Sequence, residues 1–134
     1  PVRQPCAVLL VEDDPTTRAI LTRALDDAGC TVEAVGRGRD ALDRVLGAPD
    51  DLSLVLLDMQ LPDLDGPEVA RKLREAGHAL PIVGVTANVF PREHRECVAA
   101  GMNAVLTKPV RPGRLRRAIG RWAVPPPDTD PAGA

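Results

Sequence analysis

Short apolar runs that end on acidic residues recur along the chain. Residues 6–11 (Cys-Ala-Val-Leu-Leu-Val) and 52–57 (Leu-Ser-Leu-Val-Leu-Leu) are two such runs. Because they are short and bounded by turn residues, they predict strands buried on both faces of a sheet. A piece of buried helix is the alternative for 52–57, but the run is short for a helix. Asp58 is therefore expected at the carboxyl end of a central parallel strand, where open α/β sheets bind ligands.

Three further strands and five helices complete the predicted pattern. The strands are expected at 31–35, 81–85 and 104–106, and the helices at 15–28, 39–46, 67–76, 91–100 and from 112 onward. Asp14 is the predicted N-cap of the first helix, and glycines 29, 77 and 101 are predicted stops. The apolar helix positions expected to face the core are Ile20, Leu21, Ala24, Leu25 and Ala28, then Ala41, Leu42, Val45 and Leu46, then Val69, Ala70, Leu73 and Ala76, and finally Leu115, Ile119 and Trp122.

Strands that alternate with helices predict an α/β fold with a doubly wound parallel sheet and helices on both faces. The 134 residues suit one folded unit, which we place at 6–123. Residues 1–5 are interpreted as a linker, and the proline-rich residues 124–134 as a disordered tail or linker. A chain that begins with proline and is proline-rich at both ends suggests a segment of a larger polypeptide, although removal of an expression tag would give the same start.

Composition excludes several classes of function. The net charge is −2, which gives no general attraction to nucleic acid, and no apolar stretch approaches the roughly 20 residues of a membrane span. The arginines of the last helix are interpreted as a solvated face, although partner docking there is an alternative. Three widely spaced cysteines form no metal motif, so reduced, buried thiols in a cytoplasmic protein are expected.

Polar residues with complementary chemistry follow four of the five predicted strands. They are Glu12, Asp13, Asp58, Thr86 and Lys108. Three carboxylates gathered at one sheet edge need a cation, and an all-oxygen site suits Mg²⁺. A lysine and a hydroxyl beside them are the groups that would hold a phosphoryl oxygen. Together they predict an aspartate that accepts a phosphoryl group as a covalent nucleophile.

Each of these acidic or hydroxyl residues also has a purely structural interpretation. Asp58 alone is also typical of a helix cap, and Thr86 of a cap on the turn at 88–91. Asp14 is interpreted as a helix cap rather than a ligand. Asp63 and Asp65 are interpreted as turn and cap residues.

Four motifs, in this order, resemble the receiver domain of two-component signalling. They are Val11-Glu-Asp-Asp-Pro15, the stretch from Leu57 to Gly66, Val85-Thr-Ala87 and Lys108-Pro109. The resemblance extends over residues 6–122. It implies a flavodoxin-like (βα)₅ fold with strand order 2-1-3-4-5. A nucleotide-binding α/β domain is a distant alternative, disfavoured because the glycines at 36 and 38 do not form a phosphate-binding motif.

The resemblance implies a phosphoacceptor and a metal site. Asp58 would receive a phosphoryl group from a phosphohistidine, and the domain would catalyse both this transfer and the later hydrolysis. The implied cofactor is Mg²⁺, with Mn²⁺ as an alternative. Asp13 would bind the ion directly, Glu12 through water, and Gln60 through its main-chain carbonyl.

The resemblance also implies the groups that surround the phosphate. Lys108 would pair with a phosphoryl oxygen, Thr86 would move towards the phosphate, and the N–H groups of Met59 and Ala87 would face it. The Lys108–Pro109 peptide bond would be cis. Val105 departs from the family pattern, which often has an aromatic residue three positions before the lysine.

The stretches around 86–93, 97–103 and 106–110 most resemble receivers fused to sensor histidine kinases. The implied role is a relay step in a hybrid kinase, with a histidine kinase core or a histidine phosphotransfer domain as partner. Neither nucleic acid nor direct membrane contact is expected, and the segment would be cytoplasmic, within a parent chain that would itself be a kinase. The alternative is a stand-alone or regulator-derived receiver that signals by phosphorylation-dependent protein binding.

Overall fold

Five parallel strands form one sheet in the computed structural model, which describes residues 6–87 and 90–123. The strand order is β2-β1-β3-β4-β5, which confirms the predicted topology. The strands are β1 (Ala7–Val11), β2 (Thr31–Val35), β3 (Leu54–Asp58), β4 (Ile82–Thr86) and β5 (Ala104–Thr107). The predicted linker at 1–5 and tail at 124–134 lie outside the described residues.

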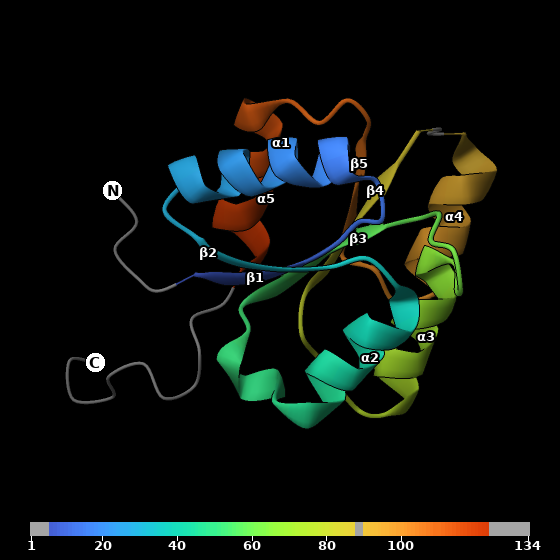
Figure 1. The fold of residues 1–134 in the computed structure, drawn as a ribbon. Helices are drawn as coiled ribbons and strands as arrows, with labels where there is room; N and C mark the ends of the chain where they lie inside the picture. Colours follow the sequence, from blue (N-terminus) through green and yellow to red (C-terminus); the bar gives the residue numbers. More distant parts are fainter. Residues whose placement is uncertain (1–5, 88–89, 124–134) are drawn as a thin grey trace.

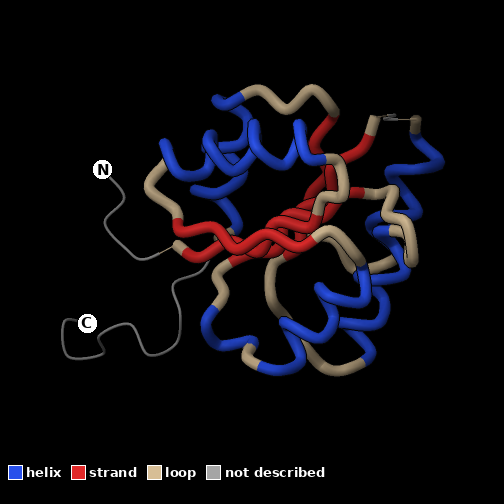
Figure 2. The backbone as a smooth tube through the Cα atoms, in the orientation of Figure 1, coloured by secondary structure: helices blue, strands red, loops and turns tan. Residues whose placement is uncertain are grey.

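Helices cover both faces of the sheet and make three layers (Figure 2). The helices α1 and α5 pack on one face, and α2, α3 and α4 pack on the other (Figure 1). Their bounds are α1 (Pro15–Asp27), α2 (Gly38–Gly47), α3 (Gly66–Glu75), α4 (Pro91–Ala99) and α5 (Pro112–Trp122), with a short 3₁₀ turn η1 (Pro49–Asp51) that was not predicted. The glycines expected to end α1, α3 and α4 all have positive φ, as helix stops commonly do.

The strands divide their side chains between two cores because alternate residues point to opposite faces. In β3, Leu54 and Leu56 join the core under α1 and α5, whereas Val55 and Leu57 join the core under α2, α3 and α4. All five residues of β3 are buried. This confirms that the run ending at Asp58 is a central strand buried on both faces.

Three helix positions predicted as core are solvent-exposed, namely Ala76, which lies just beyond the end of α3, and Ile20 and Leu46. The side chain of Ile20 in α1 is 60% exposed and that of Leu46 in α2 is 50% exposed. Each is adjacent in sequence to a buried residue, Leu21 and Val45. Successive residues on a helix are about 100° apart, so a narrow contact with the sheet buries one of them and leaves its neighbour outside.

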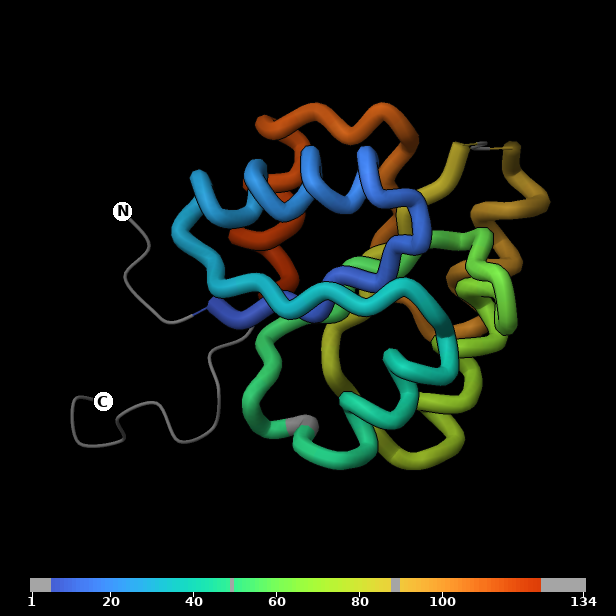
Figure 3. The backbone as a smooth tube through the Cα atoms, viewed as in Figure 1, coloured from blue at the N-terminus to red at the C-terminus, as the bar shows by residue number. Residues whose placement is uncertain are grey.

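The sheet order reverses direction at β1. From β1 the chain crosses first to β2 at one edge and then returns to β3 on the other side of β1, a path that the colours of Figure 3 follow. Such a reversal opens a crevice at the carboxyl ends of the two strands beside it. The end of β3 at Asp58 and the residues after β1 therefore border the crevice. Within 6–87 and 90–123, no helix is both long and apolar enough to cross a bilayer.

Candidate functional site

Four strand ends meet at the carboxyl edge of the sheet. Asp58 is the last residue of β3 and Thr86 the last of β4, while Glu12 follows β1 and Lys108 follows β5. The main chain holds two of these residues in place, since Glu12 N–H donates to Val35 O at 3.0 Å and Lys108 N–H donates to Thr86 O at 2.8 Å. The structure thus brings together the residues that the sequence placed at separate strand ends.

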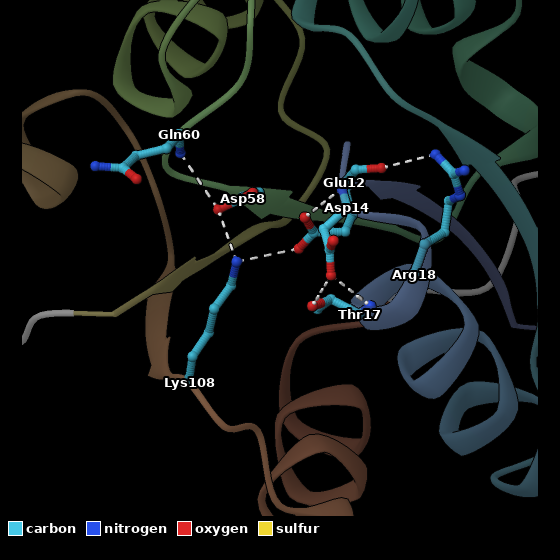
Figure 4. Close-up of polar contacts among 7 residues, drawn as sticks. All are labelled: Glu12, Asp14, Thr17, Arg18, Asp58, Gln60 and Lys108. Carbon is cyan, nitrogen blue, oxygen red and sulfur yellow. Dashed lines mark hydrogen bonds and ion pairs between the residues drawn. The ribbon is translucent and has the colours of Figure 1, made fainter.

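Lys108 bridges two buried carboxylates (Figure 4). Its Nζ lies 3.2 Å from Asp58 Oδ1 and 3.2 Å from Glu12 Oε1. The Asp58 and Glu12 side chains are 6% and 1% exposed, whereas that of Lys108 is 28% exposed. The ammonium therefore reaches from the solvent side into an otherwise acidic pocket.

Glu12, Asp13 and Asp58 form an acidic cluster. One carboxylate oxygen from each lies within 4.8 Å of the other two, and Asp13 is the exposed member. Glu12 Oε1 is buried and, despite its ion-pair distance to Lys108, has no hydrogen-bond partner among the described residues. An all-oxygen donor set with an incompletely satisfied buried oxygen and one side open to solvent fits a hard divalent cation such as Mg²⁺.

The electrostatics of Glu12 and Lys108 reflect the same crowding. Burial raises the pKa of Glu12, the N–H of Asp14 opposes this effect, and the nearby Asp58 carboxylate adds to it. Burial acts to lower the pKa of Lys108, but the charges of Asp58 and Glu12 outweigh it, so the pKa lies above its usual value. Lys108 is therefore held as a cation beside the acidic cluster.

The main chain after Asp58 corrects one prediction. The N–H of Met59 donates to Val85 O at 3.0 Å, so it belongs to the sheet and does not face a phosphate. The reason is that Asp58 is the last residue of β3 paired with β4, opposite Val85, and in a parallel ladder the N–H of the following residue makes the closing bond of that pair. The N–H of Gln60 is the one that faces the site, since it donates to Asp58 Oδ1 at 3.2 Å.

A cleft of about 300 Å³ lies beside Asp58. Thr86, Ala87, Gln60 and Lys108 line it, together with Glu93 and Glu96 from α4. Glu93 and Glu96 were missed by the sequence analysis, because no local pattern distinguishes them from other acidic residues on an exposed helix. The Lys108–Pro109 bond is cis, as the resemblance implied.

Three nearby aspartates are helix caps. Asp14 accepts from the N–H of Thr17 at 2.9 Å, and Asp65 accepts from the N–H of Glu68 at 2.8 Å. Asp63 caps a helix distant in sequence, because its carboxylate accepts from Gly38 N–H at 2.8 Å and Arg39 N–H at 2.9 Å. These contacts confirm the structural interpretations of all three residues.

Val105, the position where the family often has an aromatic residue, lies in β5. It is partly buried and packs against the core under α2, α3 and α4. Its register partner in β4 is Gly84. A short, β-branched side chain packed there cannot swing between exposed and buried positions as a larger ring can.

Sequence and structure comparisons agree with this architecture. A family model described as "Response regulator receiver domain" matches residues 8–120. The hybrid signal transduction histidine kinase L of Dictyostelium discoideum is 36% identical over 121 residues, which cover 86% of this chain and 7% of that protein. The chain thus spans only a small part of this curated relative.

Two solved structures are closely similar. The receiver domain of sensor histidine kinase PA1611 from Pseudomonas aeruginosa has a TM-score of 0.80 and 33% identity, covering 88% of this chain and 97% of that one. That structure has a magnesium ion coordinated in its active-site cleft. The Ssk1 receiver domain from Saccharomyces cerevisiae, in its complex with the histidine phosphotransfer protein Ypd1, gives a TM-score of 0.83 with 28% identity, covering 92% of each chain.

Proposed function

The chain belongs to the response regulator receiver domain family, and from this membership and the site geometry we propose that Asp58 accepts a phosphoryl group from a phosphohistidine. The observation that carries the proposal is the contact of Lys108 with Asp58 at 3.2 Å, inside a cluster of three carboxylates. A carboxylate held at the end of a buried strand, with a cation beside it and a cleft in front, has the surroundings that a phosphoacceptor needs.

The reaction is a displacement at phosphorus. A carboxylate oxygen of Asp58 forms a new O–P bond while the N–P bond of the phosphohistidine breaks, and the imidazole keeps the electron pair and takes up a proton. Negative charge is spread over the three phosphoryl oxygens in the transition state. Catalysis therefore depends on groups that are already placed to meet those oxygens.

The chain supplies several such groups around the cleft. We assign Lys108 to bind one phosphoryl oxygen. To do so, its ammonium would replace part of its contact with Asp58 by a contact with that oxygen. The hydroxyl of Thr86 and the N–H groups of Ala87 and Gln60 are assigned as further donors, since all three residues line the same cleft. Gln60 replaces Met59 in this role because its N–H already points to Asp58.

The acidic cluster is assigned to Mg²⁺, with Asp13 and Asp58 as direct ligands, Glu12 acting through water and the carbonyl of Gln60 completing the protein ligands. When bound, the ion would neutralise charge on the cluster and on the phosphoryl oxygens. The exposed position of Asp13 leaves a hydrated ion a direct approach. The same oxygen donors suit Mn²⁺, which stays a prediction.

We further propose that the parent protein is a hybrid sensor histidine kinase in which this domain is a relay step. The histidine kinase relative cited above and the Ypd1 complex of a similar receiver support this placement. The donor or acceptor histidine would then belong to a kinase core or to a phosphotransfer domain. A kinase core encoded upstream in the same gene would support the hybrid origin, and a start codon near Pro1 would contradict it.

A groove beside the site is suited to receive such a partner. It has a volume of about 310 Å³ and lies between α1 and the loop after β5. Thr17, Ile20 and Leu21 line one side, and Lys108, Pro109 and Val110 line the other. Exposed Ile20 is an apolar anchor close to the lysine of the site, so a helix seated here could bring its histidine towards Asp58.

Labelling with phosphoramidate, a small donor with an N–P bond, tests the proposal. With Mg²⁺, the wild type and the control Asp43→Asn should incorporate one phosphoryl group, and Asp58→Asn should incorporate none. Asp43 is exposed on α2 and does not line the cleft beside Asp58, so this control leaves the site intact. Equal labelling of Asp58→Asn and the wild type would refute the assignment.

A further inference from the structure

Two buried cysteines face each other at the amino-terminal ends of the strands, on the side of the sheet away from the phosphorylation site. Cys6 directly precedes β1 and Cys30 directly precedes β2. Their Sγ atoms lie 3.1 Å apart, and the residues are 7% and 3% exposed. For comparison, the Sγ of the third cysteine, Cys97, lies 3.7 Å from Met59 Sδ, an ordinary sulfur contact.

The backbone aligns the two cysteines side by side. The register of β1 with β2 pairs Ala7 with Thr31, so the preceding residues are also laterally opposed. The Thr31 N–H donates to Cys6 O at 2.8 Å, which fixes the strands at this position. Neighbouring strands lie about 4.8 Å apart, within the roughly 4.4–6.8 Å between Cα atoms that a disulfide spans.

We propose that Cys6 and Cys30 are a thiol pair that a peroxide oxidises to an intramolecular disulfide. One thiolate attacks the peroxide and becomes a sulfenic acid, releasing water or hydroxide. The second thiol then attacks that sulfur, forming the S–S bond and releasing another water. In total two electrons and two hydrogens leave the protein, and the sulfurs move together by about 1 Å to reach a bond length of about 2.05 Å.

The disulfide would close the segment from Cys6 to Cys30. This segment contains β1, the acidic residues Glu12 and Asp13, and all of α1 with the exposed Ile20. Cross-linking its two ends restricts the unfolded chain and resists separation of β1 from β2. Because the cysteines lie at the opposite ends of the strands from Asp58, the bond stabilises this unit without changing the catalytic groups.

Burial controls how readily the pair reacts. It raises the pKa of Cys6 to about 12, and hydrogen bonding to Cys30 acts in the same direction. The thiolate is the reactive form, so the closed sheet edge protects the pair. Oxidation in the folded protein should therefore be slow and proceed through local opening of the start of β1 and β2.

Peptide mapping of the folded full chain treated with hydrogen peroxide tests the proposal. We expect a loss of two hydrogens, a non-reduced peptide pair joining Cys6 to Cys30, and Cys97 still free for alkylation. The melting temperature of the oxidised protein should rise by roughly 5–15 °C and return to the starting value with dithiothreitol. Phosphoramidate labelling should be unchanged, which separates this test from that of the proposed function.

Cys97→Ala is the matched control, and it should form the disulfide like the wild type. Cys6→Ala and Cys30→Ala should form none, and the peptide map of the wild type decides the matter if either variant fails to fold. The proposal is overturned if oxidation stops at sulfenic or sulfinic acid. It is also overturned if Cys97 enters disulfides as often as Cys6 and Cys30 do.

Discussion

The ammonium of Lys108 lies 3.2 Å from Asp58 Oδ1, although Lys108 follows the edge strand β5 and Asp58 ends the central strand β3. The side chain crosses in front of β4 to reach it and also meets Glu12 at 3.2 Å. In this arrangement the lysine balances part of the charge of the acidic cluster. A metal ion bound by the same carboxylates would also neutralise part of their charge, so the lysine and the metal are electrostatically coupled.

Replacing Lys108 by methionine should expose this coupling. The substitution leaves two buried carboxylates without their cation, so the free energy of unfolding without metal should fall by about 1–3 kcal/mol. Removing the positive charge should also strengthen Mg²⁺ binding, so that Mg²⁺ stabilises Lys108→Met by roughly 1 kcal/mol more than it stabilises the wild type. Urea unfolding with and without Mg²⁺ measures both effects.

Lys72 provides the control, since it is exposed on α3. Lys72→Met should change neither the metal-free stability nor the response to Mg²⁺ beyond about 0.5 kcal/mol. An equal response to Mg²⁺ in Lys108→Met and the wild type would show that lysine and metal act independently.

Asp13 and its neighbour Asp14 should differ in their effect on metal binding. Asp13→Asn removes a carboxylate of the acidic cluster and should weaken Mg²⁺ binding at least about tenfold, as measured by calorimetric titration. Asp14 is the N-cap of α1, and asparagine caps equally well. Asp14→Asn should therefore retain an affinity within about threefold of the wild type, and a larger loss would place Asp14 among the ligands.

Most of the fold could be predicted because the strands are short apolar runs with turn residues at both ends. The strand order followed from the resemblance to receiver domains, and the meeting of Asp58 with Lys108 followed from the expectation that the carboxyl ends of parallel strands share one edge of the sheet. The exposed positions of Ile20 and Leu46 could not be predicted. Helical spacing indicates which face of a helix is apolar, but not how much of that face is buried against the sheet. The Met59 N–H was misassigned because the sequence does not show that Asp58 itself is paired with β4, which commits the N–H after it to the sheet.

Asp63 shows a different limit of sequence reasoning. Its local pattern indicates a turn or cap, and the structure confirms a cap. The helix that it caps, however, begins at Gly38, a contact between residues 25 positions apart. No local motif encodes a partner so distant in sequence, whereas Asp14 and Asp65 cap the helices that follow them directly.

Two glycine substitutions should shift stability in opposite directions. A Cβ added at Gly66 would lie 2.8 Å from Asp58 O and 2.9 Å from Met59 Cα, and neither backbone atom can move without displacing the phosphoacceptor strand. Gly66→Ala should therefore destabilise by about 1–3 kcal/mol and slow phosphoryl labelling. At Gly120, inside α5, nothing lies within 4 Å of the added carbon.

Gly120→Ala is thus the matched control for Gly66→Ala. It should stabilise by about 0.5–1 kcal/mol, because alanine favours the helix more than glycine does. Labelling of Gly120→Ala should equal that of the wild type. Similar destabilisation of both variants in urea unfolding would contradict the close-packing explanation.

The Asp63 cap should make stability depend on pH in the acid range. Its carboxylate accepts hydrogen bonds from the N–H of Arg39, which has the largest effect, and from the N–H groups of Gly38 and Leu64. These bonds lower the pKa of Asp63 below the ordinary 3.8. A group whose folded pKa is depressed stabilises the protein above its unfolded pKa and loses this contribution as the pH falls through the folded value. The contribution should therefore be complete at pH 7 and diminish below pH 3.8.

Comparison of the wild type with Asp63→Ala isolates this effect from the other carboxylates. The wild type should be more stable in urea at pH 7, and the difference should shrink steadily below about pH 4 as the capping carboxylate takes up a proton. Hydrogen exchange should locate the loss, with faster exchange of the Gly38 and Arg39 amides in the variant. A difference in stability that stays constant from pH 7 down to the acid range would mean that Asp63 acts through packing rather than through its charge.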